Sequence, residues 1–159
     1  MLVVSDTSAI SNLIQVDLLD ILHQLYGQVI IPKAVYDELS EIDSQKLFID
    51  NLSWIHIETV KNQDYVHELE NDLDKGESES IALAIQLKAD FLIIDELKGR
   101  KIAENLGIKI VGLLGSLLKA KEKGYLQTIA PIFEKLSTQA GFHINPQLKV
   151  HVLKLANEL

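Results

Sequence analysis

Two acidic residues of this sequence stand directly after short apolar segments, where their side chains could do chemistry. Asp6 follows LVVS, and Asp95 follows FLII. Short apolar segments that alternate with helical ones predict the strands of a buried parallel sheet, and ligands bind beyond the carboxyl ends of such strands. Helix capping explains either acid taken singly. Taken together, Asp6 and Asp95 are expected to face one crevice.

Further acids lie in segments that are predicted to be helices. Glu38 lies in KAVYDELSEI, where a solvated helix face is the simplest explanation, and Glu77 and Glu79 open GESESIALAIQLKA, where they complement the helix dipole. If several of these carboxylates converged, they would repel one another and would need a cation. Oxygen ligands without nitrogen or sulfur suit Mg²⁺ or Mn²⁺. Two such ions can activate a water and stabilise the leaving oxygen of a phosphodiester.

The elements that must position these acids follow from the pattern of apolar residues. Strands are expected at residues 2–5, 28–32, 54–60, 90–95 and 108–112. Helical spacing fills the segments between them, and three more helices separated by glycine and proline signals follow the last strand. This alternation predicts an α/β fold with a central parallel sheet covered by helices on both faces.

Composition limits the class of protein. A chain of 159 residues with 47% apolar and 24% charged residues is expected to form one domain. The absence of cysteine excludes thiolate nucleophiles and cysteine-ligated metals. No apolar run is long enough to span a membrane, and the early charge at Asp6 argues against a signal peptide, so a cytoplasmic location is expected. The net charge of −8 argues against a nucleic-acid partner, but residues 98–123 carry seven bases against two acids.

Four segments resemble the PIN domain family, metal-dependent ribonucleases that include the toxins of VapC-type toxin–antitoxin systems. They are VSDTSAISNL, IIPKAVYDEL, DKGESESIALA and FLIIDELKGRKIA. The GESE segment and the tail GFHINPQLKVHVLKLANEL further resemble a PIN subgroup of unknown function. The resemblance implies a three-layer α/β/α fold, with a family core at about residues 1–116 and a C-terminal helical extension at about residues 117–159.

The resemblance also implies functional residues. A Mg²⁺ or Mn²⁺ site would be held by four carboxylates that are also the catalytic groups, Asp6, Glu38, Glu79 and Asp95. Ser8 would support Asp6 or a metal-bound water, and Glu96 would be a supplementary acid. RNA phosphates would be contacted by three bases, Lys98, Arg100 and Lys101.

The third metal ligand departs from the family pattern. Most PIN nucleases place aspartate where this chain has Glu79, so either Glu79 or Glu77, two residues earlier, is the candidate. A helix turns about 100° per residue, so these two side chains point to different faces. One of the two is therefore expected to reach the metal.

Three alternatives to the ribonuclease interpretation stay open. A phosphatase of the haloacid dehalogenase type would use Asp6 as nucleophile, but it would need an acid where Ser8 stands. A receiver domain would need paired acids at the first strand. A PIN-like binding or assembly module with a silent site would keep the acids without turnover.

Partners are also expected from the sequence. The family resemblance implies RNA and a small antitoxin, and no membrane is expected. An apolar stripe in the last helix either forms a homodimer or packs on its own domain: Leu148, Val152, Leu155 and Leu159.

Overall fold

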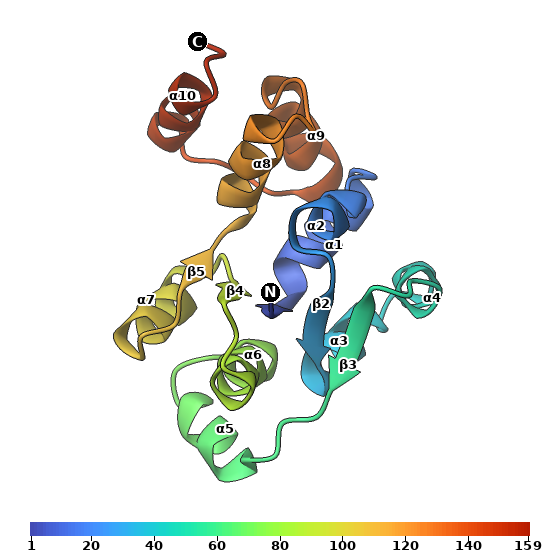
Figure 1. The fold of residues 1–159 in the computed structure, drawn as a ribbon, viewed down its shortest axis with the longest axis vertical. Coiled ribbons are helices and arrows are strands. Elements are labelled where there is room, and N and C mark those ends of the chain that lie inside the picture. The colour runs from blue at the N-terminus through green and yellow to red at the C-terminus, as the bar shows by residue number, and fades with distance from the viewer.

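The computed structural model describes all 159 residues and contains one five-stranded sheet (Figure 1). Its strands are β1 (Val3–Ser5), β2 (Val29–Pro32), β3 (Ile55–Glu58), β4 (Phe91–Ile93) and β5 (Ile110–Val111). They lie in the order β3-β2-β1-β4-β5, and every neighbouring pair is parallel. The predicted central parallel sheet is therefore confirmed, and β1 and β4 are neighbours near its middle.

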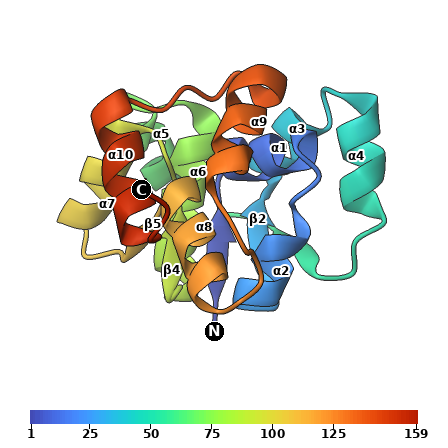
Figure 2. The ribbon, with the colours of Figure 1, turned by 90° about the horizontal axis from the view of Figure 1, so that it is seen from above.

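Ten helices connect and cover the strands. They are α1 (Thr7–Gln15), α2 (Asp20–Tyr26), α3 (Lys33–Leu39), α4 (Asp43–Asp50), α5 (Gln63–Leu69), α6 (Lys75–Leu87), α7 (Leu97–Asn105), α8 (Leu113–Glu122), α9 (Ala130–Ala140) and α10 (Pro146–Leu155). Helices α1, α2, α8 and α9 lie on one side of the sheet, and α5, α6 and α7 lie on the other (Figures 1 and 2). The expected three-layer α/β/α architecture is confirmed. None of the ten helices combines the length and the apolar character that a membrane span requires.

The two faces of the sheet bury separate apolar clusters because side chains alternate along each strand. Val3 belongs to a cluster of 29 buried residues that includes side chains of α1, α2, α8 and α9. Val4 belongs to a second cluster of 12 buried residues with side chains of α5, α6 and α7. Burial on both faces explains why the strands read as continuous apolar runs. It also fixes where each strand ends, and therefore places Asp6 directly after the end of β1.

The C-terminal helices extend the larger of the two clusters. Phe133 of α9 and Val152 of α10 are buried in the same cluster as Leu13 of α1. In the predicted apolar stripe Val152 packs on its own chain, whereas Leu148, Leu155 and Leu159 remain exposed. The predicted boundary between a family core and a C-terminal extension, at about residue 117, falls inside α8. This division of the chain stays a prediction.

Candidate active site

Asp6 and Asp95 meet at one edge of the sheet because their strands are paired in parallel. Ser5 at the end of β1 is in register with Ile93 at the end of β4. The pairing continues one residue further, since the backbone N–H of Asp6 donates to the carbonyl of Ile93 at 3.0 Å. The charge of Asp95 acts directly on Asp6. The structure thus brings together the two acids that end the central strands.

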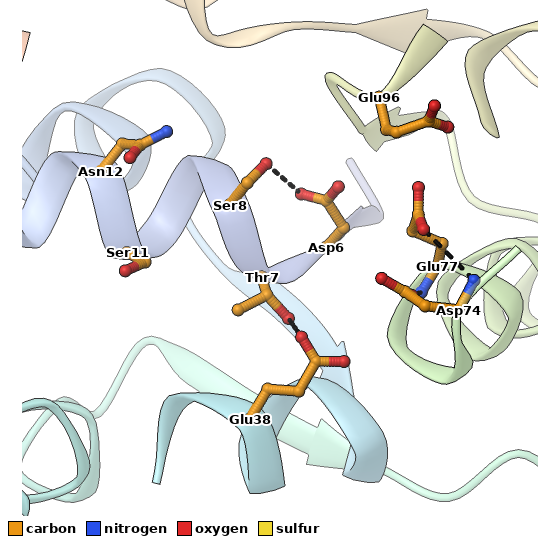
Figure 3. Close-up of a pocket in the computed structure, with 9 residues that line it drawn as sticks. All are labelled: Asp6, Thr7, Ser8, Ser11, Asn12, Glu38, Asp74, Glu77 and Glu96. Atoms are coloured by element: carbon orange, nitrogen blue, oxygen red, sulfur yellow. Dashed lines mark hydrogen bonds between the residues drawn. The ribbon is translucent and has the colours of Figure 1, made fainter. Parts of the chain in front are cut away.

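A cavity of about 410 Å³ opens beside Asp6, and none of the residues that line it is hydrophobic (Figure 3). They are Asp6, Thr7, Ser8, Ser11, Asn12, Glu38, Asp74, Glu77 and Glu96. Figure 3 places Asp6 in the middle, with Glu38 on one side and Glu77 and Glu96 on the other. Five of these nine side chains are carboxylates that come from four parts of the chain. The cavity is therefore an acidic, wholly polar pocket at the carboxyl ends of the strands.

Asp6 is a strongly perturbed and almost completely buried acid facing this pocket. Its side chain is nearly buried, with 4% of its surface exposed. Burial, followed by the charges of Asp95 and Asp74, raises its pKa from the ordinary value of 3.8 to about 7. The nearby Ala9 backbone and the Ser8 hydroxyl, which lies 3.5 Å from Asp6 Oδ1, oppose this rise without cancelling it. The ionised form of Asp6 is therefore unfavourable unless a cation is near.

The raised pKa of Asp6 predicts how the stability of the metal-free protein depends on pH. Between 3.8 and about 7 the folded state holds a proton that the unfolded state has released, so stability falls as pH rises through this window. We expect the melting temperature in EDTA to decline from pH 5 to pH 7.5, and the decline to be shallower in Asp6→Asn. If the melting temperatures of the two proteins declined equally between pH 5 and pH 7.5, the raised pKa of Asp6 would be contradicted.

Asp95 is hydrogen-bonded through only one of its two carboxylate oxygens. Its Oδ1 accepts the backbone N–H of Leu113 at 3.0 Å, whereas its Oδ2 is buried without a hydrogen-bond partner. Burial raises the pKa of Asp95, while the Leu113 amide and the charge of Arg100 lower it. Asp95 lines a neighbouring, more apolar cavity together with Arg100. A buried carboxylate oxygen without a partner is costly, and a bound cation would satisfy it.

Glu38 enters the pocket from the last turn of α3. Its Oε2 accepts the Thr7 hydroxyl at 2.7 Å, which ties α3 to the first residue of α1 (Figure 3). Burial raises the pKa of Glu38, and hydrogen bonds from Thr7 and from the Gly76 backbone lower it. The sequence explanation of Glu38 as a solvated face is therefore wrong, since the side chain is partly buried against two other elements.

Asp74 and Glu77 form the capping box that begins α6. The Asp74 side chain accepts the Glu77 N–H at 2.8 Å, and the Glu77 side chain accepts the Asp74 N–H at 3.3 Å. The second oxygen of Glu77, Oε2, is buried without a partner. Burial and Asp74 raise the pKa of Glu77 to about 8, and the Glu96 charge adds to this. Glu96 itself caps α7 by accepting the Gly99 N–H at 2.7 Å, which lowers its pKa.

Glu79, the expected third ligand, does not line this pocket. Its side chain is 4% exposed, and its Oε1 accepts the backbone N–H of Ala34 at 2.9 Å. Its other oxygen receives a long 3.4 Å contact from the Gln63 amide. As expected, the side chains of Glu77 and Glu79 point to different faces of α6. Glu77 faces the pocket that contains Asp6, whereas Glu79 points toward Ala34. A metal-ligand role for Glu79 stays a prediction that this geometry does not support.

The three predicted RNA contacts occupy different surroundings on α7. Arg100 stands beside Asp95, and its Nη1 donates to the carbonyl of Ile94 at 3.4 Å. Lys98 is exposed and lies 3.6 Å from an Asp72 carboxylate oxygen. Lys101 is exposed. All three lie on the helix that Glu96 begins, next to the acidic pocket.

Four residues of the pocket were not predicted from the sequence: Thr7, Ser11, Asn12 and Asp74. A signal existed for Asp74, because D-x-x-E ahead of an apolar run is a capping box. Ser11 lies one helical turn after Ser8, so a polar face of α1 could have been inferred. Thr7 gave no separate signal, because its role depends on the approach of Glu38.

The donors around Asp6 fit a hard divalent cation. They are carboxylate and hydroxyl oxygens, the ligands that Mg²⁺ and Mn²⁺ prefer. The unpartnered oxygens of Asp95 and Glu77 and the raised pKa of Asp6 indicate carboxyl groups whose ionised form the chain does not fully stabilise, and which a nearby cation would stabilise. No three acidic or histidine side chains stand close enough together to form a ready-made metal site. A cation bound here would therefore complete its coordination with water, as Mg²⁺ usually does.

Comparison with known proteins places this fold. The chain is similar to a PilT N-terminus domain protein from the hyperthermophilic archaeon Sulfolobus solfataricus P2, with a TM-score of 0.56 and 20% identity. The match covers 76% of this chain and 93% of that protein, and at this identity it speaks for the fold alone. A search of curated proteins gives no match. The family model described as PIN domain matches residues 2–158, and the chain therefore belongs to the PIN domain family.

Proposed function

We propose that this PIN domain is a divalent-metal-dependent ribonuclease. PIN domains are commonly nucleases that bind divalent metals. The observation that carries the proposal is the buried Asp6, whose pKa is raised to about 7 within a pocket lined by four further carboxylates. The capping box of α6 and the cap of α7 account for three of these acids, but not for Asp6, whose side chain makes no capping hydrogen bond at the start of α1, or for Glu38. Gathering the acids in one pocket also destabilises the ionised form of each. Perturbed acids in a polar cleft are more typical of a functional site.

Asp6, Glu38 and Asp95 are the proposed ligands, and Glu77 joins them in place of Glu79. Asp6, Glu38 and Glu77 line the pocket. Asp95 follows the strand paired with that of Asp6 and lines the neighbouring cavity. When bound there, Mg²⁺ or Mn²⁺ would lower the pKa of water and neutralise charge that develops on the phosphate. Ser8, whose hydroxyl lies 3.5 Å from Asp6 Oδ1, orients that carboxylate.

The bases of α7 have a separate role in the proposal. Lys98, Arg100 and Lys101 would hold the RNA phosphates flanking the cleaved bond, where the net charge of −8 would otherwise repel the substrate. Arg100 also remains beside Asp95, so its guanidinium links the phosphate contacts to the acids.

The proposal is tested by a cleavage assay on mixed single-stranded and structured RNA with Mg²⁺, with Mn²⁺ and with EDTA. Cleavage that EDTA stops and that either metal restores is the expected result. A protein that is stabilised by Mn²⁺ but cuts no RNA would instead favour the binding or assembly module. Cleavage that persists in EDTA would contradict the proposal.

A finer proposal is that the chain is the toxin of a VapC-type pair, with a small antitoxin as its partner and a homodimer as its working form. The family resemblance supports the toxin role, and the exposed Leu148, Leu155 and Leu159 support an interface. Expression in a bacterial host should then slow growth for the active protein and not for Asp6→Asn. Equal growth with both proteins would argue for a nuclease outside such a pair.

A further inference from the structure

The glycines beside the pocket leave room for its carboxylates. A Cβ atom built on Gly76 would lie 2.2 Å from Oε1 of Glu38 and 3.0 Å from its Cδ. These separations are far below van der Waals contact, so the Glu38 carboxylate occupies the place that any side chain at residue 76 would need. Gly76 has no positive φ and lies in the first turn of α6, so the backbone conformation does not call for glycine.

Glu38 is held in that place by partners on both sides. The Thr7 hydroxyl donates to its Oε2 at 2.7 Å, and the nearby Gly76 backbone stabilises the charge of the same carboxylate. The N-terminus of a long helix favours an anion, so α6 adds an attraction at this point. The close approach therefore depends on glycine, because only a residue without a side chain lets the carboxylate reach the helix backbone.

Gly112 leaves room in the same way for the carboxylate of Asp95. A Cβ atom there would lie 2.7 Å from Oδ1 of Asp95 and 2.6 Å from Nη1 of Arg100. Two of the acids proposed to bind metal are thus seated in spaces left by glycines from other elements. By contrast, Gly115 in α8 has only an apolar neighbour, Val111, whose Cγ2 would lie 3.1 Å from an added Cβ.

We propose that Gly76 is a positioning residue, which sets the location of the Glu38 carboxylate and thereby the metal affinity of the site. The inference rests on the proposed metal-dependent function. The blocking atom is the end of a flexible side chain, so an added methyl group would move the carboxylate and leave the fold in place. Alanine is also favoured over glycine inside a helix. Gly76→Ala should consequently lose metal affinity without losing stability.

The experiment measures Mn²⁺ binding by calorimetry and the melting temperature in EDTA for the whole protein. We expect Gly76→Ala to bind Mn²⁺ at least about 10-fold more weakly, as when a group that orients a metal ligand is lost. Its melting temperature should equal or exceed that of the wild type. Gly115→Ala is the matched control, and its Mn²⁺ affinity should stay unchanged.

Restoration by a second substitution separates positioning from a general structural effect. Glu38→Asp shortens the side chain by one methylene and withdraws the carboxylate from the added methyl group. The double variant Gly76→Ala/Glu38→Asp should bind Mn²⁺ more tightly than Gly76→Ala alone. Wild-type affinity in Gly76→Ala, or weak binding that accompanies a fall in melting temperature and is not restored, would overturn the inference. If the wild type itself bound no Mn²⁺, the proposed function would fail first, and the inference with it.

Discussion

Replacing Asp6 by asparagine is expected to abolish metal-dependent RNA cleavage while it raises the melting temperature of the metal-free protein. Asparagine has nearly the shape of aspartate but removes a charge that burial and two neighbouring acids make unfavourable. At pH 8, above the pKa of about 7, wild-type Asp6 is ionised and destabilises the folded state. The same charge is what a cation would bind. Stability and activity should therefore move in opposite directions.

Cleavage should fall by at least about 100-fold, because even groups one step removed from a metal contribute about 10–100-fold. The measurements are single-turnover cleavage with Mn²⁺ and thermal unfolding in EDTA at pH 8. Asp37→Asn is the control, since Asp37 is an exposed acid paired with Lys33 and exposed ion pairs contribute little. It should leave both quantities nearly unchanged. If Asp6→Asn lost stability together with activity, Asp6 would be a structural acid.

Truncating Glu79 is expected to destabilise the protein, because this side chain supports the fold beside the site. In Glu79→Ala the Ala34 N–H would lose the acceptor that now lies 2.9 Å away in a buried place. Leaving such a donor unpaired costs about 1–3 kcal/mol of unfolding free energy. Glu79→Gln should cost less, because its amide oxygen can still accept that hydrogen bond.

Urea unfolding of the two Glu79 variants measures the loss of unfolding free energy. Cleavage assays, at a temperature where the variants are folded, measure whether Glu79 is needed for activity. Glu79→Gln should retain most of its cleavage, whereas Glu77→Gln should lose it, because Glu77 faces Asp6 in the pocket. The two variants carry the same Glu→Gln substitution at positions two residues apart in α6, so they differ only in which side chain has lost its charge. The reverse result, an inactive but stable Glu79→Gln, would restore Glu79 as the third metal ligand.

The meeting of Asp6 and Asp95 could be predicted from the sequence. Both follow short, continuous apolar segments, which predict buried strands, and parallel strands place their carboxyl ends at one edge of a sheet. The structure adds the register, Ser5 opposite Ile93, that makes them neighbours. Local pattern was sufficient here because strand identity and strand direction together fix which end of the strand an acid occupies.

The choice between Glu77 and Glu79 could not be made in this way. Helical geometry gives the angle between their side chains, but which of them faces Asp6 depends on how α6 docks against the sheet and against α3. That docking is decided by apolar burial in α6 as a whole, and it leaves Glu79 against Ala34 and Glu77 in the pocket. Asp74 entered the pocket for the same reason, through its place at the start of α6.

By itself, the sequence determined the strands, the parallel sheet and the acids at its edge, because these depend on the spacing of apolar residues within short segments. The tertiary structure alone decided which acids share the pocket, how far each is buried, and that Gly76 makes room for Glu38. Those properties arise between elements distant in the chain. Burial and charge–charge distances, which set the pKa of Asp6, exist only once those elements have packed.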